Sequence, residues 1–330
     1  MKSNLKPYLF ISMALGVVIV LSLTLGAASI SVADLIQVLI KPGSNPLAEN
    51  IFWYVRLPRT IATLLAGAGL AGAGVIIQAV LANKLASPSV IGVNAGAGLG
   101  VTLCCALGYL SGWVIAGTAF LGAFFAVLFV VLLASRMQMS KTTLLLSGVA
   151  MNTILNAMAS AVTTFFPEVA IMSNDFRVGG FGSVTMSRLL PAGLCIIFAI
   201  IILMTLCNEL DVMKLGEESA QSLGLSVKKM RLIFLVLAAL LAGASVSFAG
   251  LLGFVGLIVP HIAQKFVGHE SRHLLIFSLL FGAFLVSVAD LISRLCFQPF
   301  ELPTGILLSL LGGPFFIYLL VAKKGSVHHG

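Results

Sequence analysis

Long uninterrupted apolar runs dominate the chain. Three of them, Ile61–Leu81, Val114–Leu133 and Thr142–Phe166, contain no charged residue. A helix needs roughly 20 apolar residues to cross the hydrocarbon core of a bilayer, and these runs reach that length. They do not alternate in polarity as the strands of a membrane barrel do. The pattern therefore predicts an all-α, polytopic membrane protein.

The apolar runs divide into about ten predicted spans within one transmembrane domain that covers residues 1–330. The first run follows Lys2 and Lys6, as a secretion signal would. Its apolar core is long and nine more runs follow, so we expect an uncleaved span. The eighth run is short and contains Pro260, which predicts a broken or tilted helix. The predicted spans are Tyr8–Ala27, Thr60–Leu81, Val90–Leu107, Val114–Leu133, Thr142–Phe166, Leu189–Leu206, Leu232–Ala249, Leu251–Phe266, Leu274–Leu295 and Gly305–Ala322.

Composition and charge agree with a membrane protein and orient it. Hydrophobic residues make up 59% of the chain and charged residues 9%, against about 25% charged residues in a soluble domain. With the N-terminus inside, 13 Lys and Arg residues lie on the inner side of the predicted spans and 6 on the outer side. The positive-inside rule then places both termini in the cytoplasm. The net charge of +8 follows from this bias and needs no nucleic-acid partner.

One polar segment, Asn208–Arg231, interrupts the apolar pattern and holds eight of the 30 charged residues. We call it the charged segment, and the charge bias places it in the cytoplasm. Glu217 and Glu218 begin a short helical pattern, where carboxylates complement the positive end of the helix dipole. Gly224 is a predicted stop for that helix, and Ser226 a predicted cap for the next span.

Leucines accompany the charges of this segment at positions 215, 223 and 225. An amphipathic helix that docks on a partner needs such apolar contacts. We therefore interpret the segment as a docking helix for a soluble partner, with a solvated loop as the alternative. The interpretation suits a chain that carries no Gly-Lys dipeptide and hence no P-loop of its own.

The glycines and cysteines of the chain are interpreted as packing residues and not as nucleotide-binding, disulfide or metal sites. Gly67-x-Gly69-x-x-Gly72 matches a dinucleotide fingerprint, but it lies inside a predicted span with no preceding strand, so we attribute it to close helix packing. The five cysteines form no CxxC pair, and neither a disulfide framework nor a metal site is predicted. His261 is interpreted as a packed residue, with a function at membrane depth as the alternative. The tail, residues 325–330 with His328 and His329, could be native or not and is assigned no function.

Two arginines flank Pro58 at the predicted outer entrance of the second span, Arg56 and Arg59. Proline suits the first turn of a helix. Because arginine forms bidentate pairs with carboxylates, one hypothesis is docking of acidic groups from an extracytoplasmic partner; interfacial anchoring is the other. Arg294 follows Asp290 by four residues, so an intrahelical ion pair and partner docking are both open for it.

Four small polar residues recur at helical spacing in the fifth span. They are candidates for lining a central cavity, and helix packing is the alternative interpretation. These residues are Ser147, Asn152, Asn156 and Ser160.

Five segments in order resemble the iron-siderophore, haem and cobalamin ABC importer permeases (FecCD or BtuC-like, type II importers). The resemblance covers nearly the whole chain and implies a BtuC-like fold of ten helices in the bacterial cytoplasmic membrane. The segments are Arg56–Arg59, Gln78–Gly92, Gly216–Gly224, Gly250–Ala263 and Glu301–Gly313.

The resemblance also implies partners. A second permease subunit, identical or related, would complete the membrane part. Two cytoplasmic ATPase subunits would bind ATP and Mg, and an outer substrate-binding protein or lipoprotein would deliver the substrate. This chain would be a transport subunit without catalytic residues, cofactor or metal.

Site residues follow from the matching positions. The implied coupling residues are Glu217, Glu218, Ser219, Leu223 and Gly224. The implied binding-protein docking residues are Arg56, Arg59 and Arg294. The implied cytoplasmic gate residues are Asn83, Leu85, Thr142 and Thr143, with the charges of Lys84 and Lys141 beside them.

The expected substrate is an iron chelate of the siderophore type, with haem or cobalamin as alternatives. A secondary transporter driven by protons or sodium is an alternative of another class. Such transporters place ionisable groups near the bilayer midplane, whereas Asp290 is near the end of its predicted span, and Glu168 and Asp175 fall in a predicted outer loop. An intramembrane enzyme would need paired catalytic groups, and the spans offer none.

Overall fold

A computed structural model describes residues 5–26, 36–38, 40, 45–136, 140–296 and 300–325, and those residues form helices, turns and loops without a strand. The all-α prediction is confirmed. The helices are α1 (Leu5–Thr24), α3 (Pro46–Ile51), η1 (Phe52–Arg56), α4 (Leu57–Val80), η2 (Pro88–Ile91), α5 (Val93–Ala106), α6 (Gly112–Arg136), α7 (Lys141–Phe165), α8 (Pro167–Met172), α9 (Asn174–Val178), α10 (Met186–Thr205), α11 (Cys207–Lys214), α12 (Glu217–Ser222), α13 (Val227–Ala249), α14 (Val255–Val267), α15 (Ser271–Leu295) and α16 (Thr304–Gly325).

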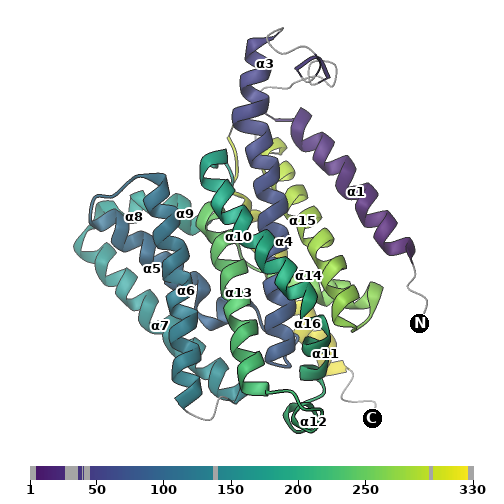
Figure 1. Cartoon of the computed structure of the whole chain (residues 1–330). Helices are drawn as coiled ribbons and strands as arrows, with labels where there is room; N and C mark the ends of the chain where they lie inside the picture. Colours follow the sequence, from purple (N-terminus) through teal and green to yellow (C-terminus); the bar gives the residue numbers. More distant parts are fainter. Residues whose placement is uncertain are drawn as a thin grey trace.

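The predicted spans correspond to the apolar helices of this bundle. Seven helices are long and apolar enough to cross a membrane, and three shorter apolar helices accompany them within the described residues. Each of the ten predicted spans coincides with one of these. Helix α12 lies at one end of the bundle, at the bottom of Figure 1, and α1 lies along one side of the bundle. Residues 326–330, with His328 and His329, lie outside the described residues.

The second span begins earlier than predicted, because the helix is already formed at Pro46 and runs without interruption to Val80. Asn45 caps its start by accepting a hydrogen bond from the Ala48 amide at 3.2 Å. Pro58 therefore lies inside a continuous helix. The wide π turn η1, closed by the bond from the Leu57 amide to the Phe52 carbonyl, immediately precedes it. A π turn relaxes the backbone where the proline ring would otherwise meet the preceding turn.

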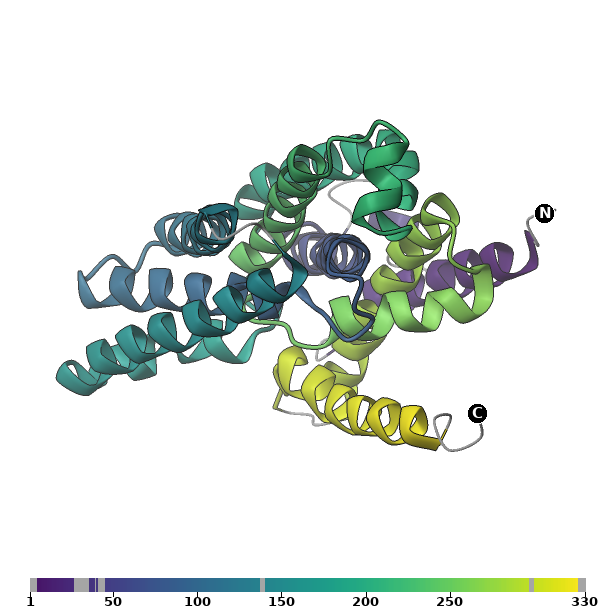
Figure 2. The ribbon, with the colours of Figure 1, turned by 90° about the horizontal axis from the view of Figure 1, so that it is seen from below.

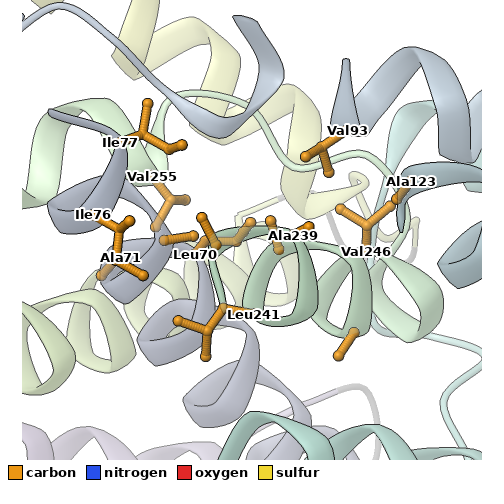
Figure 3. Packing of buried hydrophobic residues seen from close by; sticks show 14 of the residues in the cluster. Leu70, Ala71, Ile76, Ile77, Val93, Ala123, Ala239, Leu241, Val246 and Val255 are labelled. Atoms are coloured by element: carbon orange, nitrogen blue, oxygen red, sulfur yellow. The ribbon is translucent and has the colours of Figure 1, made fainter. Parts of the chain in front are cut away.

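Helix α4 is the centre of the bundle, and its glycines set the helix-to-helix distances. A Cβ on Gly67 would overlap the Gly282 carbonyl of α15, and one on Gly74 would overlap the Gly256 carbonyl of α14. The predicted close helix packing is thus confirmed, and the glycines that match the dinucleotide fingerprint serve that packing. Helix α4 also contributes Leu70, Ala71, Ile76 and Ile77 to the core (Figure 3).

The eighth span is continuous through Pro260, so the predicted break lies elsewhere. Residues 250–254 form the non-helical stretch, and α14 begins only at Val255. Gly250 has a φ of +70° and approaches the Phe176 carbonyl too closely for a Cβ. Helix α13 therefore ends at Ala249, before this glycine.

Helices α1, α7 and α16 lie at the periphery of the bundle (Figure 2). Burial agrees with this position for α1 and α7. In their most apolar stretches, 22% and 17% of the residues are buried inside the structure, against 78% in the helix that contains α4. α7 is also the least apolar of the long helices, with a mean hydropathy of 1.4.

Candidate functional site

The charged segment folds into two short helices, α11 and α12, at one end of the bundle (Figure 1). Glu217 and Glu218 occupy the first turn of α12, as predicted. Gly224 follows with a φ of +83°, which confirms it as the stop. Ser226 occupies the N-cap position of α13 as predicted, but its side chain makes no capping hydrogen bond.

Helix α11 is attached to the start of α15 by charged groups. The Ser271 amide donates to both carboxylate oxygens of Asp211, at 2.9 and 3.1 Å. Lys214 Nζ donates to Asp211 at 3.0 Å, to the His269 carbonyl at 2.7 Å and to Ser271 Oγ at 2.6 Å. Asp211 thereby supplies the negative group that the N-terminus of α15 favours.

Helix α12 is attached to α13 by an ion pair. Arg231 Nη2 lies 3.2 Å from Glu217 Oε2, and Arg231 is only 1% exposed. Ala220 is fully buried, whereas Glu218, Ser219 and Gly224 are exposed and Leu223 is 64% exposed. The predicted coupling residues therefore divide into one that faces the bundle, Glu217, and four that face outward.

The leucines of the charged segment divide in the same way. Leu215 and Leu223 are exposed on either side of α12. Leu225 is half-buried and packs against the core. Two of the three predicted apolar docking contacts are thus available at the surface.

At the opposite end of the bundle the three predicted docking arginines are buried, with exposures of 4% for Arg56, 7% for Arg59 and 3% for Arg294. Arg59 Nη2 pairs with Asp290 at 3.0 Å, and Arg59 Nη1 pairs with Glu301 at 2.7 Å. The predicted intrahelical pair is present, since Arg294 Nε lies 3.1 Å from Asp290 Oδ2. Carboxylates of this chain thus engage Arg59 and Arg294, and docking of the three arginines on an outer partner stays a prediction.

Asp290 is the residue that sequence reasoning undervalued. It is fully buried, and beside its two arginines it accepts a hydrogen bond from Thr304 Oγ1 at 3.1 Å. Its contact with Arg59 joins residues 231 positions apart, so no local spacing could reveal it. The sequence did offer one indication. Arginines in a bundle with very few charges need acidic partners when they are buried, and Asp290 is one of the few acidic residues in the predicted spans.

The predicted gate residues form local turns near the α12 end. Asn83 Oδ1 accepts from the Leu85 amide at 2.9 Å, and Ser140 Oγ caps α7 by accepting from the Thr143 amide at 3.1 Å. Thr142 is exposed beside it. Lys84 and Lys214 line one cavity of about 180 Å³. The turn after α4 and the charged segment therefore lie side by side.

The four predicted pathway residues of α7 separate into two pairs. Ser147 is buried, and Asn152 donates to the Ser89 and Val90 carbonyls at 2.9 and 3.1 Å. These two residues serve packing. Asn156 and Ser160 are exposed, on the face that also carries Thr153 and Thr164. That face is the part of α7 open to a pathway or a partner.

This bundle of membrane-crossing helices, with a charged helical segment at one end, defines a membrane transport permease. The chain belongs to the FecCD transport family, which residues 14–322 match. It is 35% identical to the Fe(3+)-citrate import system permease protein YfmE of Bacillus subtilis over 97% of this chain and 96% of that protein. It is 36% identical to the vitamin B12 import system permease protein BtuC of Klebsiella pneumoniae, covering 87% of each chain.

A solved structure supports the same assignment. The chain superposes with a TM-score of 0.84 on an inward-facing transporter described as of the metal-chelate ABC type, at 28% identity over 95% of this chain and 98% of that one. The BtuC-like fold is confirmed. The chain is therefore the permease component of an ABC importer of the metal-chelate, haem and vitamin B12 type, a multi-pass membrane protein.

Proposed function

We propose that this chain is the permease subunit of an ATP-driven importer for an iron chelate of the siderophore type. Similarity to a ferric-citrate permease over nearly the whole of both chains supports this substrate class. Two partner ATPase subunits would bind ATP and Mg, and this chain would alternate access to a central cavity. Import of haem or cobalamin by the same machinery is the alternative.

The observation that carries the proposal is the outward face of α12. Glu218, Ser219 and Leu223 are exposed at one end of a chain that has no P-loop. An ATP-driven transporter built on this chain would need a motor subunit outside it, and α12 offers such a subunit both charge and apolar surface. ATPase subunits docked there would bias the bundle between two conformations.

The orientation of the chain follows from the same assignment. If α12 meets cytoplasmic subunits, both termini are cytoplasmic, in agreement with the distribution of Lys and Arg. The end that carries Arg56, Arg59 and Arg294 then faces the outer binding protein. Because Glu301 already engages Arg59, an acidic group of the binding protein would reach that arginine by displacing Glu301.

The exposed face of α7 supports a second permease subunit, identical or related. Within the described part of the chain, the Asn156 side chain makes no hydrogen bond and is exposed. A polar amide facing hydrocarbon is costly. A second subunit, with a water-filled pathway between the two copies, would cover this face and the exposed start of α7 at Thr142.

Reconstitution tests the proposal. The permease, its ATPase and its binding protein would be placed in proteoliposomes with ferric citrate, a ferric siderophore, haem or cobalamin outside. We expect uptake of a ferric chelate that depends on internal ATP and ceases with an ATPase-inactive partner. Uptake of haem or cobalamin alone would overturn the substrate class. Uptake driven by a proton or sodium gradient without ATP would identify a secondary transporter instead.

A further inference from the structure

We infer that Glu217 is a positioning residue that holds α12 to α13 through Arg231, and that partner contact belongs to its neighbour Glu218. The inference rests on the proposed function, because it assigns how movement of α12 enters the bundle. It also separates two adjacent carboxylates that the sequence presents as equivalent.

The burial of Arg231 makes the pair necessary. The side chain of Arg231 is 2% exposed, whereas that of Glu217 is 40% exposed. A guanidinium buried this deeply depends on its polar partners, and the Glu217 carboxylate is the acidic group paired with it at 3.2 Å. The pair therefore favours arrangements in which Glu217 stays beside α13 when α12 moves. The first residue of α12 and the fifth residue of α13 behave as one unit.

The short length of α12 makes this attachment important. A helix of six residues cannot persist by itself, since isolated helices below about 12–15 residues are marginal. Ala220, fully buried, and the bond from the Leu225 amide to the Ala220 carbonyl at 3.0 Å complete the inner face. Glu218 and Leu223 stay on the outer face.

Two attachments of the charged segment converge on the central helix. α12 joins α13, which approaches α4 so closely that a Cβ on Gly69 would meet Ser245 and the Leu241 carbonyl. α11 joins the start of α15 through Asp211, and α15 approaches α4 at Gly67 and Gly282. A movement of α12 would thus be passed to α4 through polar contacts to α13 and α15, which both pack closely on α4. α4 in turn reaches the opposite end of the bundle, where Arg59 pairs with Asp290.

The test compares the two carboxylates in the reconstituted complex. We expect Glu217→Gln to retain the ATPase subunits within about twofold but to lower transport per ATP hydrolysed by about tenfold, the size of a typical coupling between sites. Glu218→Gln should instead weaken ATPase binding. Lys6→Gln, which removes an exposed charge from the peripheral helix α1 outside the charged segment, is the control, and we expect it to change neither quantity.

Charge exchange gives the decisive rescue. Glu217→Arg combined with Arg231→Glu should recover at least part of the lost transport per ATP, which a general folding defect would not allow. Because Arg231→Gln can prevent folding, Arg231→Lys, which keeps the charge on a shorter side chain, provides a second single variant. Loss of ATPase binding in Glu217→Gln but not in Arg231→Lys would overturn the inference, as would unchanged transport per ATP in both.

A measurement without ATPase subunits separates this inference from the proposed function. The thermal unfolding of the detergent-solubilised permease would be compared for Glu217→Gln, Arg231→Lys and the double variant. We expect strongly non-additive effects, because the two residues form one pair. Additive effects would overturn the inference even in a complex that transports. A wild-type complex without ATP-dependent uptake would instead overturn the proposed function.

Discussion

At the residue scale, one buried carboxylate organises the end of the bundle opposite to α12. Asp290 receives hydrogen bonds from Arg59 and Thr304 and lies beside Arg294. Arg294 continues the network to α1, where its Nη2 donates to Ser22 Oγ at 2.9 Å. Four helices, α1, α4, α15 and α16, are thus joined through the charges around a single side chain.

Asp290→Asn should be strongly destabilising, because it keeps the shape of the side chain but leaves two buried arginines without their shared counterion. We expect a loss of about 3–5 kcal/mol in the free energy of unfolding, measured by chemical denaturation in detergent. Glu301→Gln is the control. It also removes a partner of Arg59, but its side chain is 41% exposed, and exposed pairs contribute about 1 kcal/mol or less. Equal losses for the two variants would contradict the central role of Asp290.

At the element scale, apolar length was sufficient to predict the ten apolar helices of the bundle. The ten spans appear where the runs predict them, since backbone groups in lipid must be bonded within their own segment. The start of the second span was not predictable in this way. The helix from Pro46 to Pro58 contains the charged residues Glu49 and Arg56, so it does not belong to an apolar run. It is completed by the Asn45 cap and the π turn, which are visible only in the folded backbone. Charge partners between distant helices, such as Arg59 and Asp290, also require the fold.

Gly67→Ala tests the packing of the central helix. The added Cβ would overlap the backbone carbonyl of Gly282, which cannot rotate away as a side chain can. We expect α4 and α15 to separate at a cost of about 1–3 kcal/mol, seen as a lower thermal midpoint in detergent. Gly16→Ala in α1 meets no atom within 4 Å and should be neutral or slightly stabilising. A neutral Gly67→Ala would show that the two helices are not held at this distance.

At the scale of the whole molecule, the two ends of the bundle differ in how their charges are used. At the arginine end, Asp290 and Glu301 engage the arginines, and Glu301 is a member of the cluster that reaches the surface. At the α12 end, Asp211 and Glu217 attach the short helices to the bundle, whereas Glu218 is exposed. Sequence reasoning located both ends but could not separate charges that pair within the chain from charges that reach the surface, because exposure is a property of the folded chain.

The exposed polar face of α7 gives the last prediction. If it lines a pathway beside a second subunit, a cysteine at position 156 should react with a membrane-impermeant maleimide in the reconstituted complex, and the rate should change during ATP turnover. A cysteine at position 198 is the control, because Phe198 is 62% exposed on the apolar helix α10 and should face lipid. Both would be introduced into a variant without the five native cysteines. Equal protection of positions 156 and 198 would mean that α7 faces lipid. In that case the cost of the unpaired Asn156 amide in hydrocarbon would have no compensation, and another helix face would have to line the pathway.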